Sequence, residues 1–310
     1  MFKTHAAKLT DAKQAKRLSR SYSALSLASF VGLAIVSFGI DLSNFGLDEA
    51  NTFWEFGLRT ILPNATLAIA GGSFGYGAKL YFQRSLDIDA QTLHDNLLVD
   101  EGASSEDFIL YLRSFDSTDQ VKKTVTRGSS SSNGSSSSTT YELEDQLLKA
   151  SKALGQFVAL GQSLETTGAG RIKTSDEEWQ KSADALMQAA KLIVMMPVTN
   201  PGTLWEVNKI LNENMMPKTV FLNAESKLSF FKNTNFNQKD DWPKLQDKFS
   251  DFGYILPKFR KSGRMYYYGH GKTPVYDKDF RFESDGHLRD FMKRAIAMSN
   301  DPELKPKWWW

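Results

Sequence analysis

The sequence AAKLIVMMPVTNPGTLWEVNKIL, residues 189–211, decides the fold of this chain. It holds an apolar run at residues 192–196, then a loop with two prolines, then an amphipathic stretch that begins at residue 203 and continues to residue 214. A short apolar run is typical of a buried strand, and apolar residues spaced three and four apart are typical of a helix. The stretch therefore predicts a strand, a loop and a helix in succession.

The same alternation extends in both directions from this stretch. Further strands are predicted at residues 108–112, 157–160, 219–222 and 254–256, and further helices at residues 141–154, 176–190, 240–252 and 284–299. Apolar strands separated by helices indicate a parallel sheet that is covered on both faces. We therefore predict a doubly wound α/β domain of the flavodoxin-like type. A Gly/Ser-rich tract at residues 128–138 is expected to form a flexible insertion in it, since such a tract buries no apolar area.

Composition excludes several classes of chemistry. The chain has 310 residues, a formal net charge of +2 and no cysteine. Without cysteine there is no disulfide framework, thiolate-bound zinc, iron–sulfur cluster or thiol nucleophile. The 4 histidines show no pair at the spacing of metal ligands, so no metal is expected.

Two uncharged runs of 19 residues, at residues 22–40 and 60–78, are each just long enough to cross a bilayer. Basic residues flank the pair on its outer sides, and the connector between the runs is acidic. The positive-inside rule then predicts a two-helix hairpin in the inner (plasma) membrane, with both termini in the cytoplasm. Small residues at helical spacing suggest close helix contacts, either within the hairpin or between copies in a homo-oligomer. The alternative is a pair of buried helices in a soluble domain.

These features divide the chain into four parts. Residues 1–21 form a basic N-terminus, residues 22–85 the transmembrane hairpin, residues 86–252 the α/β domain, and residues 253–310 a basic, aromatic extension of small α+β type. Basic residues among aromatics can bind nucleic acid or anionic lipid headgroups. A hairpin with a solvated basic face explains the extension as well, and a nucleic-acid partner is not expected.

The loops that follow the predicted strands bring chemically useful residues to one edge of the sheet. The candidates for ligand binding are Arg113, Ser114, Asp116, Gly161, Arg171, Asn200 and Trp205, and the candidate catalytic residue is Glu206. Arginines and a helix N-terminus suit phosphate groups. A carboxylate beside a sugar suits the oxocarbenium-like transition state of glycosidic bond cleavage. Together these residues fit a nucleotide whose N-glycosidic bond is broken.

Glu206 also has a purely structural interpretation. Thr203 and Glu206 have the spacing of a capping box, in which the glutamate side chain reaches back to the backbone N–H of the first residue. A carboxylate in the first turn of a helix is in any case stabilised by the helix dipole. Capping and catalysis both remain open for this residue.

At these residues the chain resembles the TIR family. FILYLRSFDSTD, residues 108–119, is similar to the opening TIR strand, and residues 189–211 are similar to the strand, loop and helix that carry the Trp and the Glu of NAD-cleaving TIR domains. A wider group of bacterial membrane proteins with an LRSF strand, a glycine-rich loop and a W-E helix is also similar. The resemblance implies Glu206 as the catalytic glutamate and NAD or a related nucleotide as substrate, with no other cofactor. In bacteria it implies stress or phage-defence signalling.

Three functions stay open at this point. The first is a membrane-anchored, nucleotide-binding effector that cleaves NAD or a relative. The second is a non-catalytic membrane sensor or scaffold that self-assembles through its α/β domain. The third is an effector whose hairpin disrupts the bilayer. Nucleoside deoxyribosyltransferase-like folds also place a Glu on such a helix, so enzyme activity is not settled by the resemblance.

Overall fold

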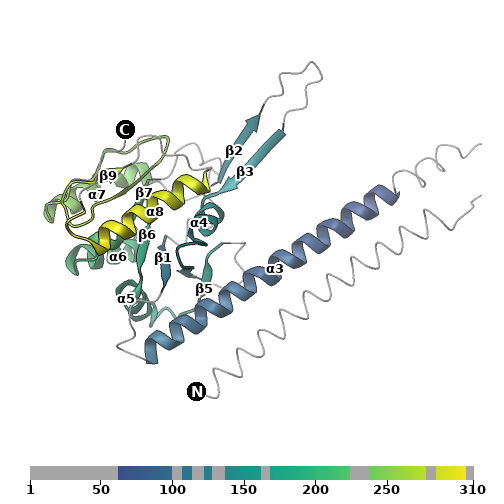
Figure 1. Cartoon of the computed structure of the whole chain (residues 1–310), viewed down its shortest axis with the longest axis horizontal. Coiled ribbons are helices and arrows are strands. Elements are labelled where there is room, and N and C mark those ends of the chain that lie inside the picture. Colours follow the sequence, from purple (N-terminus) through teal and green to yellow (C-terminus); the bar gives the residue numbers. More distant parts are fainter. Residues whose placement is uncertain are drawn as a thin grey trace, which may run out of the picture. The chain divides into compact units, whose positions relative to one another are not determined.

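The computed structural model describes residues 62–99, 107–113, 122–127, 137–161, 168–223, 238–276 and 284–304 (Figure 1). The chain forms two compact units, Met1–Ile88 and Asp89–Trp310. In the first unit, the described residues belong to helix α3 (Leu62–Val99), which continues into the second unit. The second unit is an α/β domain and contains all the other elements described below.

A sheet of seven strands forms the centre of the second unit. Its order is β5 (Gly170–Ile172), β4 (Gln156–Leu160), β1 (Phe108–Leu112), β6 (Leu192–Met195), β7 (Thr219–Asn223), β8 (Arg264–Tyr267) and β9 (Val275–Tyr276). The first five strands are parallel to one another, and β8 and β9 are antiparallel to their neighbours. The predicted α/β class with a mainly parallel sheet is thereby confirmed.

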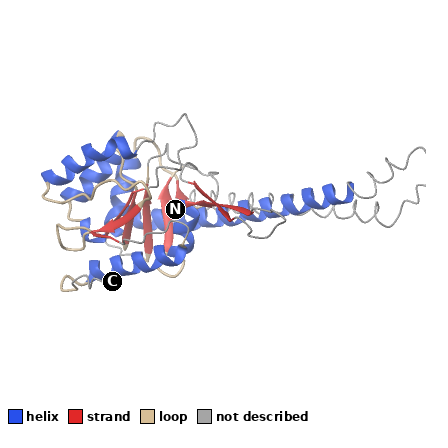
Figure 2. Cartoon of the chain, turned by 90° about the horizontal axis from the view of Figure 1, so that it is seen from above, coloured by secondary structure: helices blue, strands red, loops and turns tan. Residues whose placement is uncertain are grey.

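Helices cover both faces of this sheet (Figure 2). On one face pack α5 (Trp179–Ala189), α6 (Pro201–Asn212), α7 (Gln238–Asp251) and the last turns of α3. On the other face pack α4 (Leu143–Ser151) and α8 (Asp285–Asn300). Successive strand residues alternate between the two cores, so that Leu110 faces the first group of helices and Ile109 the second. Each fully buried aliphatic side chain contributes about 1.5–3 kcal/mol to stability.

The region between β1 and α4 differs from the prediction. Strands β2 (Lys122–Arg127) and β3 (Ser137–Glu142) pair in an antiparallel hairpin that is separate from the main sheet (Figure 1). The Gly/Ser-rich insertion predicted at residues 128–138 therefore loses its last two residues to β3, and residues 128–136 lie outside the described part of the chain. The helix predicted from residue 141 begins at Leu143 instead. Thr and Tyr are residue types with a high preference for strands, which agrees with the place of Thr139, Thr140 and Tyr141 in β3.

The C-terminal residues also depart from expectation. Residues 254–256, predicted as a strand, belong to no strand or helix. The strand beside β7 is β8 instead, where Val220 is in register with Tyr267. Together with β9 and α8, it places much of the predicted α+β extension in the same sheet and core as the rest of the domain. Strand β5 and the 3-10 turn η5 (Met216–Lys218) were not predicted.

The structure describes only part of the predicted membrane hairpin. Most of the second uncharged run, residues 60–78, lies in α3. Within the described ranges, no helix combines the length and the apolar composition that crossing a bilayer requires. The first run, residues 22–40, and the acidic connector lie outside the described residues.

Candidate functional site

The strand order reverses between β1 and β6, at the centre of the parallel sheet. The backbone N–H of Met196 donates to the carbonyl of Leu112, 3.0 Å away, just beyond the paired strands. After this bond the two segments diverge, since the chain after β1 leads to α4 and the chain after β6 leads to α6 on the opposite face. Open α/β sheets bind ligands outside the carboxyl ends of their strands at such a point.

Helix α6 begins at this edge with an asparagine cap. The Asn200 Oδ1 accepts a hydrogen bond from the backbone N–H of Thr203 at 2.8 Å, and Pro201 is the first helical residue. Proline suits this position because the missing N–H has no partner there in any case. The helix thus starts two residues earlier than predicted, and the capping box expected between Thr203 and Glu206 is absent because Thr203 is not the cap.

Glu206 lies on the buried side of α6 and is only 7% exposed. Its Oε2 has no hydrogen-bond partner among the residues that the structure describes. Burial raises the pKa of this carboxyl to about 8, because a charged carboxylate loses its hydration in such a place. Glu206 is therefore mostly protonated at pH 7. A carboxyl group with a strongly raised pKa at a sheet edge is a candidate for chemistry.

Trp205, the neighbour of Glu206, takes part in an aromatic contact between two helices. Its ring meets that of Trp179 on α5 edge-on, with the centroids 5.2 Å apart and the planes at 72°. Both rings are partly buried against the core, and the Lys209 Nζ lies 6.0 Å from the Trp205 centroid. Trp179 was not among the predicted site residues, because nothing in the sequence separates it from an ordinary core aromatic.

The two predicted arginines come together on a third residue, Glu144. The Arg171 Nη2 contacts the Glu144 Oε1 directly, and the Arg113 Nε lies 3.4 Å from the Glu144 Oε2. Both arginine side chains are almost fully buried, at 3% exposure for Arg113 and 1% for Arg171. The arginines thus bind a carboxylate of the α4 face, whereas Glu206 belongs to α6 on the other face.

The loop that leads into β5 completes the surroundings of Glu144. The backbone N–H of Ala169 donates to the Glu144 Oε1 at 2.8 Å. A Cβ atom on Gly168 would lie 2.0 Å from the same oxygen, so only glycine leaves room for the carboxylate. Burial, and then the Glu144 charge, also raise the pKa of the neighbouring Tyr111 phenol.

Glu144 is the main residue that sequence reasoning missed. It was not among the predicted site residues, yet its carboxylate lies between two buried guanidinium groups. The partners are separated from it by roughly 30 residues on either side, beyond the reach of any local pattern. The available signal was chemical, since an acidic first turn stood between two arginines that were both predicted to be near the sheet.

The remaining predicted ligand residues are of two kinds. Ser114 and Asp116 lie outside the described residues. Gly161 follows β4 at the carboxyl edge, and its N–H donates to the carbonyl of Ile172 at 3.2 Å. Gly161 therefore extends the pairing between β4 and β5.

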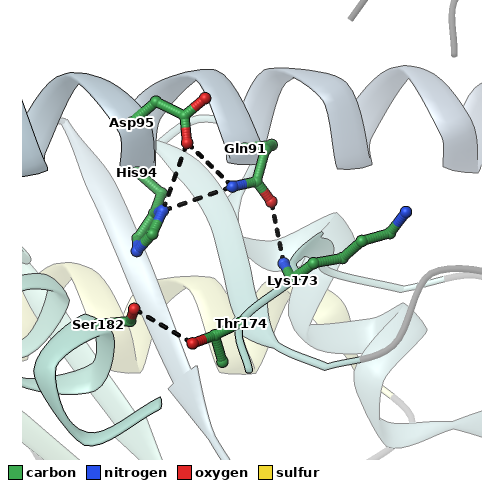
Figure 3. A network of polar contacts seen from close by, with 6 residues as sticks. All are labelled: Gln91, His94, Asp95, Lys173, Thr174 and Ser182. Carbon is green, nitrogen blue, oxygen red and sulfur yellow. Dashed lines mark hydrogen bonds and ion pairs between the residues drawn. The ribbon is translucent and has the colours of Figure 1, made fainter. Parts of the chain in front are cut away.

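A second polar cluster links the end of α3 to the segment after β5, and Thr174 of that segment contacts Ser182 of α5 (Figure 3). The Gln91 Oε1 accepts from the backbone N–H of Lys173 at 3.0 Å, and its Nε2 donates to the Asp95 Oδ1 at 3.0 Å. His94 is 5% exposed, and its ring extends towards Ser182 (Figure 3). Burial lowers the pKa of His94, against the opposing effect of Asp95. Through the bond between Gln91 and Lys173, this cluster holds the end of α3 next to the edge strand β5.

Among the described residues, no group of three His, Cys, Asp or Glu side chains is placed to hold a metal ion. Comparison of the chain with protein-family models, with curated proteins and with solved structures finds no match.

Proposed function

We propose that the α/β domain binds a nucleotide at the carboxyl edge of its sheet and cleaves the N-glycosidic bond of NAD or a related nucleotide. The single observation that carries the proposal is the Glu206 carboxyl group, which is buried at that edge with one oxygen that has no hydrogen-bond partner among the described residues. The flavodoxin-like, TIR-like character of the domain belongs to the same proposal. It is supported by the strand order around β1 and β6.

The chemistry follows from the protonation of Glu206. A carboxyl group with a pKa of about 8 is mainly neutral in the empty site at pH 7. The nicotinamide ring of NAD is cationic, so its approach favours the negative carboxylate. When the bond from ribose C1′ to nicotinamide breaks, the electron pair leaves with the ring nitrogen and positive charge develops on the ribose. The carboxylate stabilises this charge, and water adds to C1′ with loss of a proton.

The start of α6 supplies the second support. Asn200 caps the first turn of the helix, where the positive end of the helix dipole favours negatively charged ligand groups. Glu206 lies in the second turn of the same helix. A nucleotide bound at this edge would therefore lie close to the segment that carries Glu206.

The test is NAD turnover by the full-length chain, compared with Glu206→Gln and with the same substitution at the exposed residue Glu177, Glu177→Gln, as a control. We expect Glu206→Gln to lower kcat/KM by a factor on the order of 10²–10⁴, and Glu177→Gln to leave it unchanged. The kcat/KM of the wild type should rise with pH up to about 8, where the free carboxyl group ionises. No turnover, or equal turnover by Glu206→Gln, would refute the proposal.

A second candidate function is supported by the contacts of Glu144. Because this carboxylate already binds Arg113 and Arg171, the domain fits a non-catalytic sensor or scaffold as well. In that case Glu206→Gln would preserve the cellular function, while NAD levels would stay constant. The NAD measurement therefore separates the two candidates.

We also propose that the N-terminal residues attach the chain to the inner face of a membrane. The support is the uncharged run at residues 22–40, preceded by six basic residues against one acidic residue within residues 1–20. Fractionation of cells that express the full chain should recover it with the membranes after a carbonate wash. Recovery in the soluble fraction would contradict this part of the proposal, and the homo-oligomer predicted for the hairpin would lose its basis.

A further inference from the structure

Glu144 has the surroundings that proteins build for an anionic ligand. Three donor groups converge on its carboxylate: the Arg113 guanidinium after β1, the Arg171 guanidinium in β5, and the Ala169 backbone N–H before β5. Paired guanidinium groups and oriented backbone N–H groups are the usual means of holding phosphate oxygens. The absence of a side chain at Gly168 opens the space that the anion fills.

The donors are more deeply buried than the anion between them. The side chains of Arg113 and Arg171 are 3% and 1% exposed, whereas that of Glu144 is 15% exposed. Glu144 also lies in the first turn of α4, two residues after β3, so a small movement of one helix end would withdraw it. The carboxylate is therefore the component that can be exchanged from the solvent side without moving the sheet.

We propose that Arg113, Arg171 and the Ala169 N–H form a binding site for a phosphate or pyrophosphate group, and that the Glu144 carboxylate occupies this site until the ligand displaces it. A pyrophosphate carries more negative charge than a single carboxylate and offers more oxygens to the same donors. It therefore competes with Glu144, and Glu144 sets the ligand concentration at which the site fills. The inference deepens the proposed nucleotide binding, because it assigns the phosphate groups of that nucleotide to these residues.

The experiment measures binding of inorganic pyrophosphate and of inorganic phosphate to the full-length chain by titration calorimetry. Glu144→Gln keeps the shape and the acceptor oxygen for Ala169 but removes the competing charge. We expect it to bind pyrophosphate at least tenfold more tightly than the wild type. The exposed Glu177→Gln removes the same charge elsewhere and should leave the affinity unchanged. Tighter binding of both probes indicates a site for one phosphate group, and tighter binding of pyrophosphate alone indicates a site for two; both support the proposal.

A second arm identifies the donors. Adding Arg171→Lys to Glu144→Gln should reverse the gain in affinity, because lysine cannot present two parallel N–H groups to an oxyanion. If Glu144→Gln is folded and binds pyrophosphate no more tightly than the wild type, the proposal is wrong. An equal gain with Glu177→Gln would also overturn it, since the effect would then be one of net charge.

Glu144→Gln removes one member of a largely buried ion cluster. If this variant fails to fold, a measurement on the wild type still tests the proposal. Saturating pyrophosphate should change amide hydrogen exchange in residues 143–148 and 168–172, where Glu144 leaves and Ala169 changes its acceptor. Unchanged exchange in both segments would overturn the proposal. Glu206→Gln should bind pyrophosphate as the wild type does. Failure of NAD cleavage is thereby distinguished from failure of the anion site.

Discussion

Two glutamates on opposite faces of the same sheet differ in how the protein accommodates their carboxyl groups. Glu144 on α4 lies between two arginine side chains and accepts a backbone hydrogen bond. Glu206 on α6 has one oxygen with no hydrogen-bond partner in the described part of the chain, and burial raises its pKa to about 8. The first carboxyl group is paired with cations, and burial favours the neutral form of the second.

The difference shows that burial penalises a charged carboxylate, and that the neighbouring groups determine how this penalty is met. Moving a carboxylate out of water carries a penalty, which neighbouring cations offset on the α4 face and which protonation avoids on the α6 face. A neutral carboxyl group that can become charged is suited to act on a substrate, whereas a charged group held by cations is suited to hold structure or to reserve an anion site.

The largest expected effect is that of Glu206→Gln on stability at high pH. The folded protein holds the Glu206 proton up to about pH 8, whereas the unfolded chain releases it near the ordinary value of 4.5. The wild type therefore loses stability as the pH rises between these two values. Glutamine has no proton to lose, so the variant should gain up to about 5 kcal/mol in free energy of unfolding above pH 8, and far less at pH 5.

Chemical denaturation at pH 5, 6.5 and 8 measures this gain as a difference between variant and wild type. The difference cancels other titrating groups, among them His94, whose lowered pKa weakens the protein as the pH falls below 6.5. Glu177→Gln, on an exposed residue, should change the free energy of unfolding by less than about 0.5 kcal/mol. A gain from Glu206→Gln that is equal at pH 5 and pH 8 would show that Glu206 is charged in the folded protein.

The contrast between the two glutamates also marks what the sequence could predict. The strands at β1, β4, β6 and β7 were predictable because each is a short apolar run buried on both faces. The place of Glu206, soon after β6 on a helix, followed from the same pattern. Its raised pKa did not, because burial depends on how α6 turns towards the sheet.

Other features depend on contacts between distant segments. The position of Glu144 requires β5, a strand of three residues that carries no apolar run long enough to detect. The hairpin of β2 and β3 interrupts the expected helix start and shifts it by two residues, to Leu143. Asn200 was predicted as a ligand residue from its position in the loop, and its role as helix cap became evident only with the start of α6 at Pro201.

The next effect concerns the other glutamate. Arg171→Met leaves the Glu144 carboxylate buried with a weaker set of partners, and removing one member of a buried ion pair destabilises proteins by about 3–5 kcal/mol. Adding Glu144→Gln to Arg171→Met should restore part of this loss, because the uncompensated charge disappears. Lys191→Met is the control, since Lys191 pairs at 2.7 Å with Asp107, which is 84% exposed, and such pairs contribute about 1 kcal/mol or less. Equal losses in Arg171→Met and Lys191→Met would contradict the assignment of Glu144 as a buried anion.

The smallest expected effect comes from alanine substitutions at two glycines. Gly168 lies beside the Glu144 carboxylate, and Gly202 lies in the helix that carries Glu206. Gly168→Ala would place a methyl group 2.0 Å from the Glu144 Oε1, and the carboxylate cannot give way without lengthening its contacts to Arg113 and Arg171. We expect a loss of about 1–3 kcal/mol in free energy of unfolding, as for other overpacked sites. Gly202→Ala, in the first turn of α6, meets nothing closer than 3.9 Å and should be neutral or gain up to about 1 kcal/mol, because alanine favours a helix. Chemical denaturation measures both. If Gly168→Ala is as harmless as Gly202→Ala, the Glu144 carboxylate can leave its arginines at little cost. The contacts between Glu144 and the arginines would then contribute little to stability.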